Sequence, residues 1–179
     1  MNQFKHAWNF AFNNWQYFLI LAAPVMAVEI ATASLIAPVQ NVTQPEDLMT
    51  FIEDNSMVIG TIGLLGMVLS ISFIGGLFVA YNAKEEGIDI EPLSALFSGL
   101  KKFFPILGAY LLASIAVFFS AFLLILPAFY IAGRLSLFAP FIMFENKSIT
   151  ESLQLSWEKT DEHGGILFGL TLLFFLITM

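Results

Sequence analysis

The stretch Phe103–Phe144, FFPILGAYLLASIAVFFSAFLLILPAFYIAGRLSLFAPFIMF, contains a single charged residue, Arg134. An apolar helix needs about 20 residues to cross a hydrocarbon core about 30 Å thick, and this stretch is roughly twice that long. Pro127 lies near its middle, and a proline ends or breaks a helix. The sequence therefore predicts two membrane spans, 103–125 and 127–144, that form a tight hairpin with its turn at Pro127.

Two more full spans precede this hairpin. Residues 18–39 are interrupted only by Glu29, and residues 57–83 carry no charge. A fifth apolar run, 165–179, is too short to cross the core at 1.5 Å per residue. The predicted fold is an all-α, polytopic transmembrane helical bundle, a single membrane domain over 1–179 with four full spans and an incomplete fifth. We expect at least one further span to follow.

Composition excludes several classes of function. Hydrophobic residues make up 58% of the 179 residues and charged residues 12%, about half the charged share of a soluble domain. The formal net charge of -7 leaves no basic face for nucleic acid. With no cysteine and two histidines, His6 and His163, a metal site is not expected, because zinc needs three or four convergent ligands. No catalytic motif is present, so we predict neither an enzyme nor a cofactor.

The lysines predict the orientation. The loop 38–56 carries four acidic residues and neither lysine nor arginine. The other set of loops holds six lysines: Lys5, Lys84, Lys101, Lys102, Lys147 and Lys159. This positive-inside pattern places the amino terminus in the cytoplasm. A secretory signal with its cleavage site near Ala31–Ala33 is the alternative, although Glu29 lies where such a signal stays neutral.

Three short amphipathic segments, each on the cytoplasmic side, lead into apolar spans. They are residues 3–16, 92–102 and 149–162, and their tryptophans, Trp8, Trp15 and Trp157, are suited to anchoring at the headgroup layer. Ser148 and Glu151 have the spacing of a capping box. In the last segment, apolar spacing predicts one face of Ile149, Leu153, Trp157 and Thr160. The pattern fits either a three-fold repeat of helix pairs or ordinary anchoring of separate spans.

Two charges inside predicted spans are candidate site residues. Glu29 and Arg134 each lie about 11 residues from the cytoplasmic end of their spans, which places both roughly 16 Å deep. Opposite charges at matching depth predict an intramembrane ion pair. Such a pair either fixes helix register or forms a proton or anion site that binds an acidic headgroup or a carboxylate.

Glycines in the second span predict close helix packing. They recur on the segment 57–83, where small residues let helix backbones approach one another. Packing is favoured over an unwound substrate site of the transporter type. The glycines are Gly60, Gly63, Gly66, Gly75 and Gly76.

One part of the sequence resembles a known family. The stretches LPAFYIAGR at 126–134, FAPFIMFE at 138–145, Glu151–Leu153 and Ser156-Trp157 resemble the YciC-like family of bacterial inner-membrane proteins. They are also similar to the membrane region attached to some glycerophosphodiester phosphodiesterases. The resemblance implies a multi-pass domain of a bacterial inner (plasma) membrane, and it implies no catalytic residues.

These patterns favour a non-enzymatic integral membrane protein with an envelope scaffold or partner-binding role. The alternative is a transporter or lipid-handling protein that uses Glu29 and Arg134. The expected partners are membrane lipids and either another membrane protein or a second copy of this chain.

Overall fold

The structure is a computed structural model that describes residues 2–42, 44–123 and 125–178. These residues form helices joined by short turns, with no strand among them. The chain divides into two compact units, Met1–Lys101 and Lys102–Met179. The all-α prediction is confirmed for the part of the chain described.

Five apolar segments in these ranges are long enough to cross a membrane. Their positions agree with the predicted spans to within a few residues, although the third ends at residue 121 and the fifth begins at 161. The segments are Trp15–Val39, Ser56–Glu85, Phe103–Ala121, Leu126–Phe144 and Asp161–Thr178.

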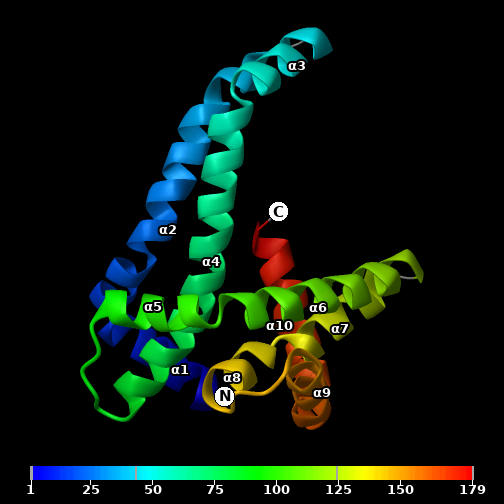
Figure 1. Ribbon diagram of the computed structural model, residues 1–179. Helices are drawn as coiled ribbons and strands as arrows, with labels where there is room; N and C mark the ends of the chain where they lie inside the picture. Colours follow the sequence, from blue (N-terminus) through cyan, green and yellow to red (C-terminus); the bar gives the residue numbers. More distant parts are fainter. Residues whose placement is uncertain (1, 43, 124, 179) are drawn as a thin grey trace. The chain divides into compact units, whose positions relative to one another are not determined.

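The first unit is built on a long helical hairpin. Two apolar helices run side by side, a short acidic helix lies at the tip of the hairpin, and another short helix packs across the second long helix (Figure 1). In chain order the elements are α1 (Asn2–Asn13), α2 (Trp15–Ile36), η1 (Ala37–Asn41), α3 (Pro45–Asp54), α4 (Ser56–Glu85) and α5 (Pro92–Lys101).

Helix α3 lies within residues 38–56, which were predicted as a loop. Pro45 begins it, and Glu46 and Asp47 occupy its first turn, where proline and negative charge both favour a helix start. Leu48 and Phe51 line an apolar hollow together with residues of α2 and α4. The acidic segment is therefore an amphipathic helix.

Helices α4 and α5 approach each other closely through small residues. A Cβ added at Gly76 would lie 2.8 Å from the carbonyl oxygen of Ala95, and one added at Gly99 would overlap the carbonyl oxygen of Ser72. Such close backbone approach requires residues without bulky side chains. Beside this crossing, Leu21 of α2 packs with Ala95 and neighbouring apolar residues.

The predicted packing glycines differ in their surroundings. Gly75 and Gly76 are buried, and a Cβ at Gly66 would lie 3.3 Å from a methyl of Val28 on α2. At Gly60 and Gly63, an added Cβ would have no contact within 4 Å among the described residues apart from its chain neighbours and the adjacent backbone of its own helix. The small-residue contacts therefore concentrate in the second half of α4.

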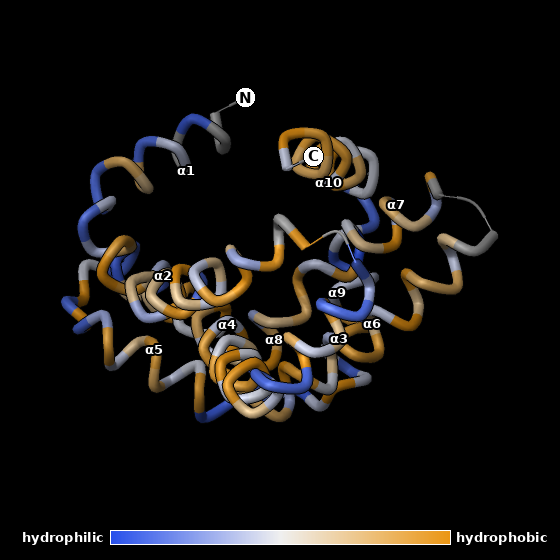
Figure 2. Tube along the Cα trace, turned by 90° about the horizontal axis from the view of Figure 1, so that it is seen from above, coloured by the Kyte–Doolittle hydropathy of each residue, from blue (hydrophilic) through white to orange (hydrophobic). Residues whose placement is uncertain are grey.

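The second unit contains a pair of helices, a short helical hairpin and a final apolar helix. Helices α6 and α7 lie side by side, and α10 packs against α7 (Figure 1). The hydrophobic character of α10 contrasts with the mixed character of α1 in Figure 2. The elements are α6 (Phe103–Leu123), α7 (Ile125–Leu135), α8 (Phe138–Phe144), α9 (Ile149–Lys159), η2 (Asp161–His163) and α10 (Gly164–Thr178).

Two prolines determine where helices begin in this unit. Helix α7 begins at Ile125 and carries Pro127 in its first turn, where a missing N–H costs little. The predicted span 127–144 is divided into α7 and α8, because Pro140 has no N–H for the carbonyl of Ser136 and its ring crowds that carbonyl. A break therefore lies at Ser136-Leu137.

Helix α9 has the predicted capping box, and its buried stripe contains only part of the predicted apolar face. The Ser148 hydroxyl accepts from the backbone N–H of Glu151, and the Glu151 carboxylate accepts from the backbone N–H of Ser148. Of the residues predicted on its apolar face, Thr160 is buried and Trp157 is 40% exposed. The buried stripe consists of small hydroxyl residues, Ser152, Ser156 and Thr160.

Substitution of Gly99 by alanine is expected to destabilise the protein by about 1–3 kcal/mol, because the new Cβ would overlap backbone atoms of Ser72 and Gly76. Gly60→Ala is the matched control, since alanine favours the helix and no described atom opposes it there. Thermal unfolding of the purified protein in detergent measures both. Equal midpoints for the two variants would contradict the close crossing.

The capping box predicts a pH dependence. The pKa of Glu151 lies below its usual range because the carboxylate accepts hydrogen bonds from the Ser148 hydroxyl and then from the Ser148 N–H. These bonds stabilise α9 above the usual glutamate range, and the stabilisation is lost as the pH falls through the lowered pKa. Ser148→Ala should return the pKa toward its usual value, measured by NMR titration of the Glu151 side chain, whereas Ser98→Ala should leave it unchanged.

Candidate functional site

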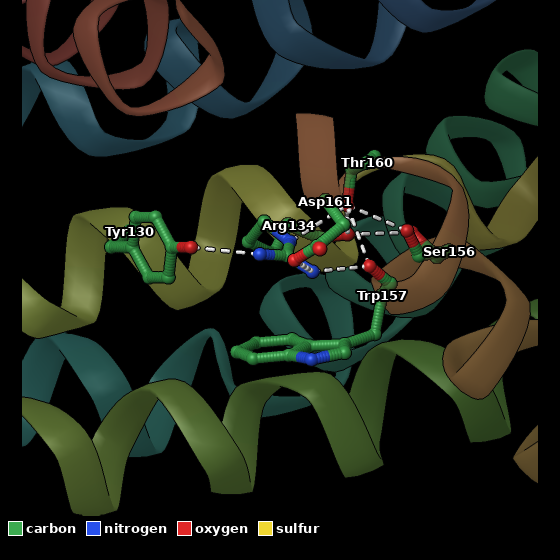
Figure 3. A network of polar contacts seen from close by, with 6 residues as sticks. All are labelled: Tyr130, Arg134, Ser156, Trp157, Thr160 and Asp161. Atoms are coloured by element: carbon green, nitrogen blue, oxygen red, sulfur yellow. Dashed lines mark hydrogen bonds and ion pairs between the residues drawn. The ribbon is translucent and has the colours of Figure 1, made fainter. Parts of the chain in front are cut away.

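Arg134 lies at the centre of a polar network in the second unit. It occupies the last turn of α7 and is 2% exposed. Figure 3 shows its guanidinium between Tyr130 of its own helix and the end of α9. A buried arginine is stable only where a counter-charge neutralises it and its N–H groups have hydrogen-bond acceptors.

Each nitrogen of the Arg134 guanidinium has a partner. Nε donates to the Thr160 hydroxyl at 3.0 Å, and Nη1 donates to the Tyr130 hydroxyl at 2.7 Å. Nη2 donates to the carbonyl oxygen of Trp157 and pairs with the Asp161 carboxylate at 2.9 Å. Of the five N–H donors of an arginine, four are thus directed at acceptors within the fold.

Two aromatic rings flank the same group. The guanidinium carbon lies 4.3 Å from the centroid of the Trp157 ring and 5.5 Å from that of Tyr130. These are cation–π distances, which add attraction where water is excluded. Trp157, predicted as an interfacial anchor, therefore also covers the guanidinium.

Ser156 of α9 and Thr160, which follows α9, form hydrogen bonds across the break between α7 and α8. The Ser156 hydroxyl donates to the carbonyl oxygen of Arg134 at 2.8 Å and accepts from the backbone N–H of Leu137 at 3.1 Å. Thr160 Oγ1 lies 2.6 Å from the carbonyl oxygen of Ser156 and 3.1 Å from that of Arg134. Side chains of α9 thus supply bonds that a continuous helix would make with its own backbone.

Two glycines allow α10 to reach this network. A Cβ added at Gly133 would lie 3.1 Å from backbone atoms of Leu167, and one at Gly164 would lie 3.0 Å from the Tyr130 hydroxyl. Helix α10 therefore begins directly against Tyr130 and Arg134. The network joins α7, α9, η2 and α10 around a single charge.

The electrostatics are asymmetric. The Arg134 side chain is 2% exposed, whereas that of Asp161 is 77% exposed. The carboxylate therefore keeps most of its hydration while it neutralises the buried cation, which lowers the desolvation cost of the pair. Within the described ranges no group of three or more His, Cys, Asp or Glu side chains could hold a metal ion. The arrangement is suited to fixing helices in place.

The other predicted site residues lie elsewhere. Glu29 is an exposed residue of α2 in the first unit, and its pairing with Arg134 stays a prediction. In the structure the ion pair of Arg134 is with Asp161. Trp8 and Trp15 are 57% and 56% exposed, in α1 and at the start of α2.

Sequence reasoning missed Tyr130, Thr160 and Asp161 as partners of Arg134. The prediction compared how deep each residue lies along a straight span. The helix break at Ser136 means that depth cannot be counted along one straight helix from residue 144 to Arg134. The buried hydroxyls at Ser152, Ser156 and Thr160 recur every four residues on α9, a spacing that could have identified its inner side. Residues from two of the four stretches that carry the family resemblance, 126–134 and 156–157, meet in this network.

Comparison of the chain with protein-family models, with curated proteins and with solved structures finds no match.

We expect Arg134→Met to destabilise the protein by about 3 kcal/mol, because it removes the ion pair with Asp161 and the guanidinium hydrogen bonds to Thr160, Tyr130 and Trp157. Lys159→Met is the matched control, since it removes an exposed cation two residues from Trp157 and Asp161. Unfolding midpoints in detergent measure both changes. A loss from Lys159→Met as large as that from Arg134→Met would contradict the proposed strength of the network.

Charge exchange distinguishes the two acidic partners. Arg134→Glu combined with Asp161→Arg should recover part of the stability that Arg134→Glu loses. Recovery by Glu29→Arg instead would favour the pair predicted from the sequence.

Proposed function

We propose that the protein is a non-enzymatic, multi-pass protein of a bacterial inner membrane, similar to the YciC-like family, with a scaffold or partner-binding role. The amino terminus and the lysine-bearing turns lie in the cytoplasm in this proposal. The acidic helix α3 lies on the opposite side.

Exposed apolar helices support insertion into a membrane. On α10, Phe174 and Ile177 are 73% and 74% exposed, and on α6 Phe104 is 78% exposed. Transfer of so much apolar surface into water would be costly, whereas lipid covers it without penalty. The helices satisfy their backbone hydrogen bonds internally, as a bilayer requires.

The observation that carries the scaffold role is the engagement of Arg134. Buried arginines inside apolar segments are functional candidates by default. Here four of the donors and the charge are directed at the protein's own Tyr130, Trp157, Thr160 and Asp161. A transporter that used this guanidinium for a substrate would need to release these contacts, so the geometry favours a structural role.

The network also indicates how deep Arg134 lies in the membrane. Arg134 is bonded to the chain at Trp157–Asp161, and Lys159, Glu162 and His163 in and next to this segment are exposed. Exposed charged residues favour water over hydrocarbon. In our proposal Arg134 therefore lies near the cytoplasmic surface, and α10 enters the membrane from Gly164.

Topology can be tested with single cysteines, because the chain has none of its own. Glu53→Cys on α3 should react with a membrane-impermeant maleimide in intact spheroplasts. Lys84→Cys should react only after permeabilisation. Labelling of Lys84→Cys in intact spheroplasts would overturn the orientation, and recovery of folded protein from a detergent-free aqueous extract would overturn membrane insertion.

The partner-binding role has its own test. Mild-detergent purification from the native host should retain a stoichiometric protein partner, and Arg134→Met should reduce its yield only in proportion to the loss of folded protein. Full retention of fold with complete loss of a bound anionic metabolite in that variant would favour the transporter alternative.

A further inference from the structure

A groove of about 600 Å³ lies along α6, opposite the break between α7 and α8. This size falls in the range of ligand sites, about 300–1,000 Å³. It belongs entirely to the second unit, and its lining residues do not include Arg134. It is therefore a separate feature from the network described above.

The groove is polar at one end and apolar at the other. Tyr110 and Ser114, one turn apart on α6, face the broken segment at Ser136. One and two turns further along α6, the lining is Phe118 and Ala121. Successive turns of one helix thus present hydroxyl groups first and hydrocarbon afterwards, as an amphiphilic ligand requires.

The hydroxyl groups at the polar end are available. The Tyr110 ring is held edge-on against Phe138, with centroids 4.9 Å apart, and its hydroxyl has no hydrogen-bond partner among the described residues. Ser114 has none there either, whereas Ser120 on the same helix donates to the carbonyl of Val117. Non-helical backbone at membrane depth is tolerated where it is buried in protein or lines a cavity.

No lining residue carries a charge. An ion without a counter-charge in such a site would pay a large desolvation cost. A ligand with neutral hydroxyl and ester groups suits the polar end of the groove, and its acyl chains suit the apolar end. We propose that this groove binds an uncharged glycerolipid of the diacylglycerol class, with its hydroxyl and ester oxygens at Tyr110 and Ser114 and one acyl chain along Phe118 and Ala121.

The inference rests on the proposed membrane location, and the experiment separates the two. Full-length protein is reconstituted into nanodiscs of zwitterionic phospholipid that contain a small fraction of photoactivatable diacylglycerol or photoactivatable phosphatidylglycerol. Failure to enter nanodiscs would overturn membrane insertion. Labelling sites, mapped by mass spectrometry, report on the groove.

Diacylglycerol should label the α6 and α7 peptides at the groove, and phosphatidylglycerol should label them several-fold less. Loss of both hydroxyls in Tyr110→Phe with Ser114→Ala should reduce labelling by diacylglycerol about thirtyfold, since each of the two bonds contributes about 1 kcal/mol. Tyr81→Phe, which removes a similarly exposed hydroxyl from the first unit, should leave the labelling unchanged.

Two tryptophan substitutions, one inside the groove and one outside it, provide an independent test. Ala121→Trp fills the apolar end of the groove, whereas Ala116→Trp adds the same ring to an exposed position of α6 outside it. Labelling should fall with the first variant alone. Equal labelling by the two lipids, equal effects of the two tryptophans, or crosslinking of a second copy of the chain into the groove would overturn the proposal.

Discussion

The buried guanidinium of Arg134 is the constraint on which the second unit depends. Burial of its charge is tolerable only because residues from α7, α9 and η2 supply acceptors together. Those acceptors fix where α9 ends and where α10 begins, and the hydroxyls of α9 compensate for the helix break at Ser136. One charged side chain thus holds α7, α9, η2 and α10 in fixed relative positions. Apolar packing alone would let these helices slide past one another.

The two units achieve close packing by different means. In the first, Gly76 and Gly99 bring the backbones of α4 and α5 into contact. In the second, Ser152 and Ser156 give α9 a narrow inner side that also donates hydrogen bonds. In both, a short helix packs against the apolar helix before it, and its small residues determine how close the two backbones can come.

Much of the helical architecture was predictable, because length and hydropathy alone define apolar helices. Residues 92–102 and 149–162 also formed the expected short helices, and the Ser148 capping box was confirmed. The partners of Arg134 were not predictable from depth along a span, because Pro140 divides that span and changes its course. Helix α3 was missed since its acidic residues resemble a solvated loop, although Pro45 and the acidic first turn indicate a helix start.

The acidic character of α3 affects how the first hairpin would insert in the proposed topology. A bacterial membrane maintains an electrical potential that is negative inside, and movement of one elementary charge across 100 mV is worth about 2.3 kcal/mol. Export of Glu46, Asp47, Glu53 and Asp54 on one short helix would therefore be driven electrophoretically. The energised membrane would itself draw this tip outward and hold it there, with no need for a large exported domain to act as an anchor.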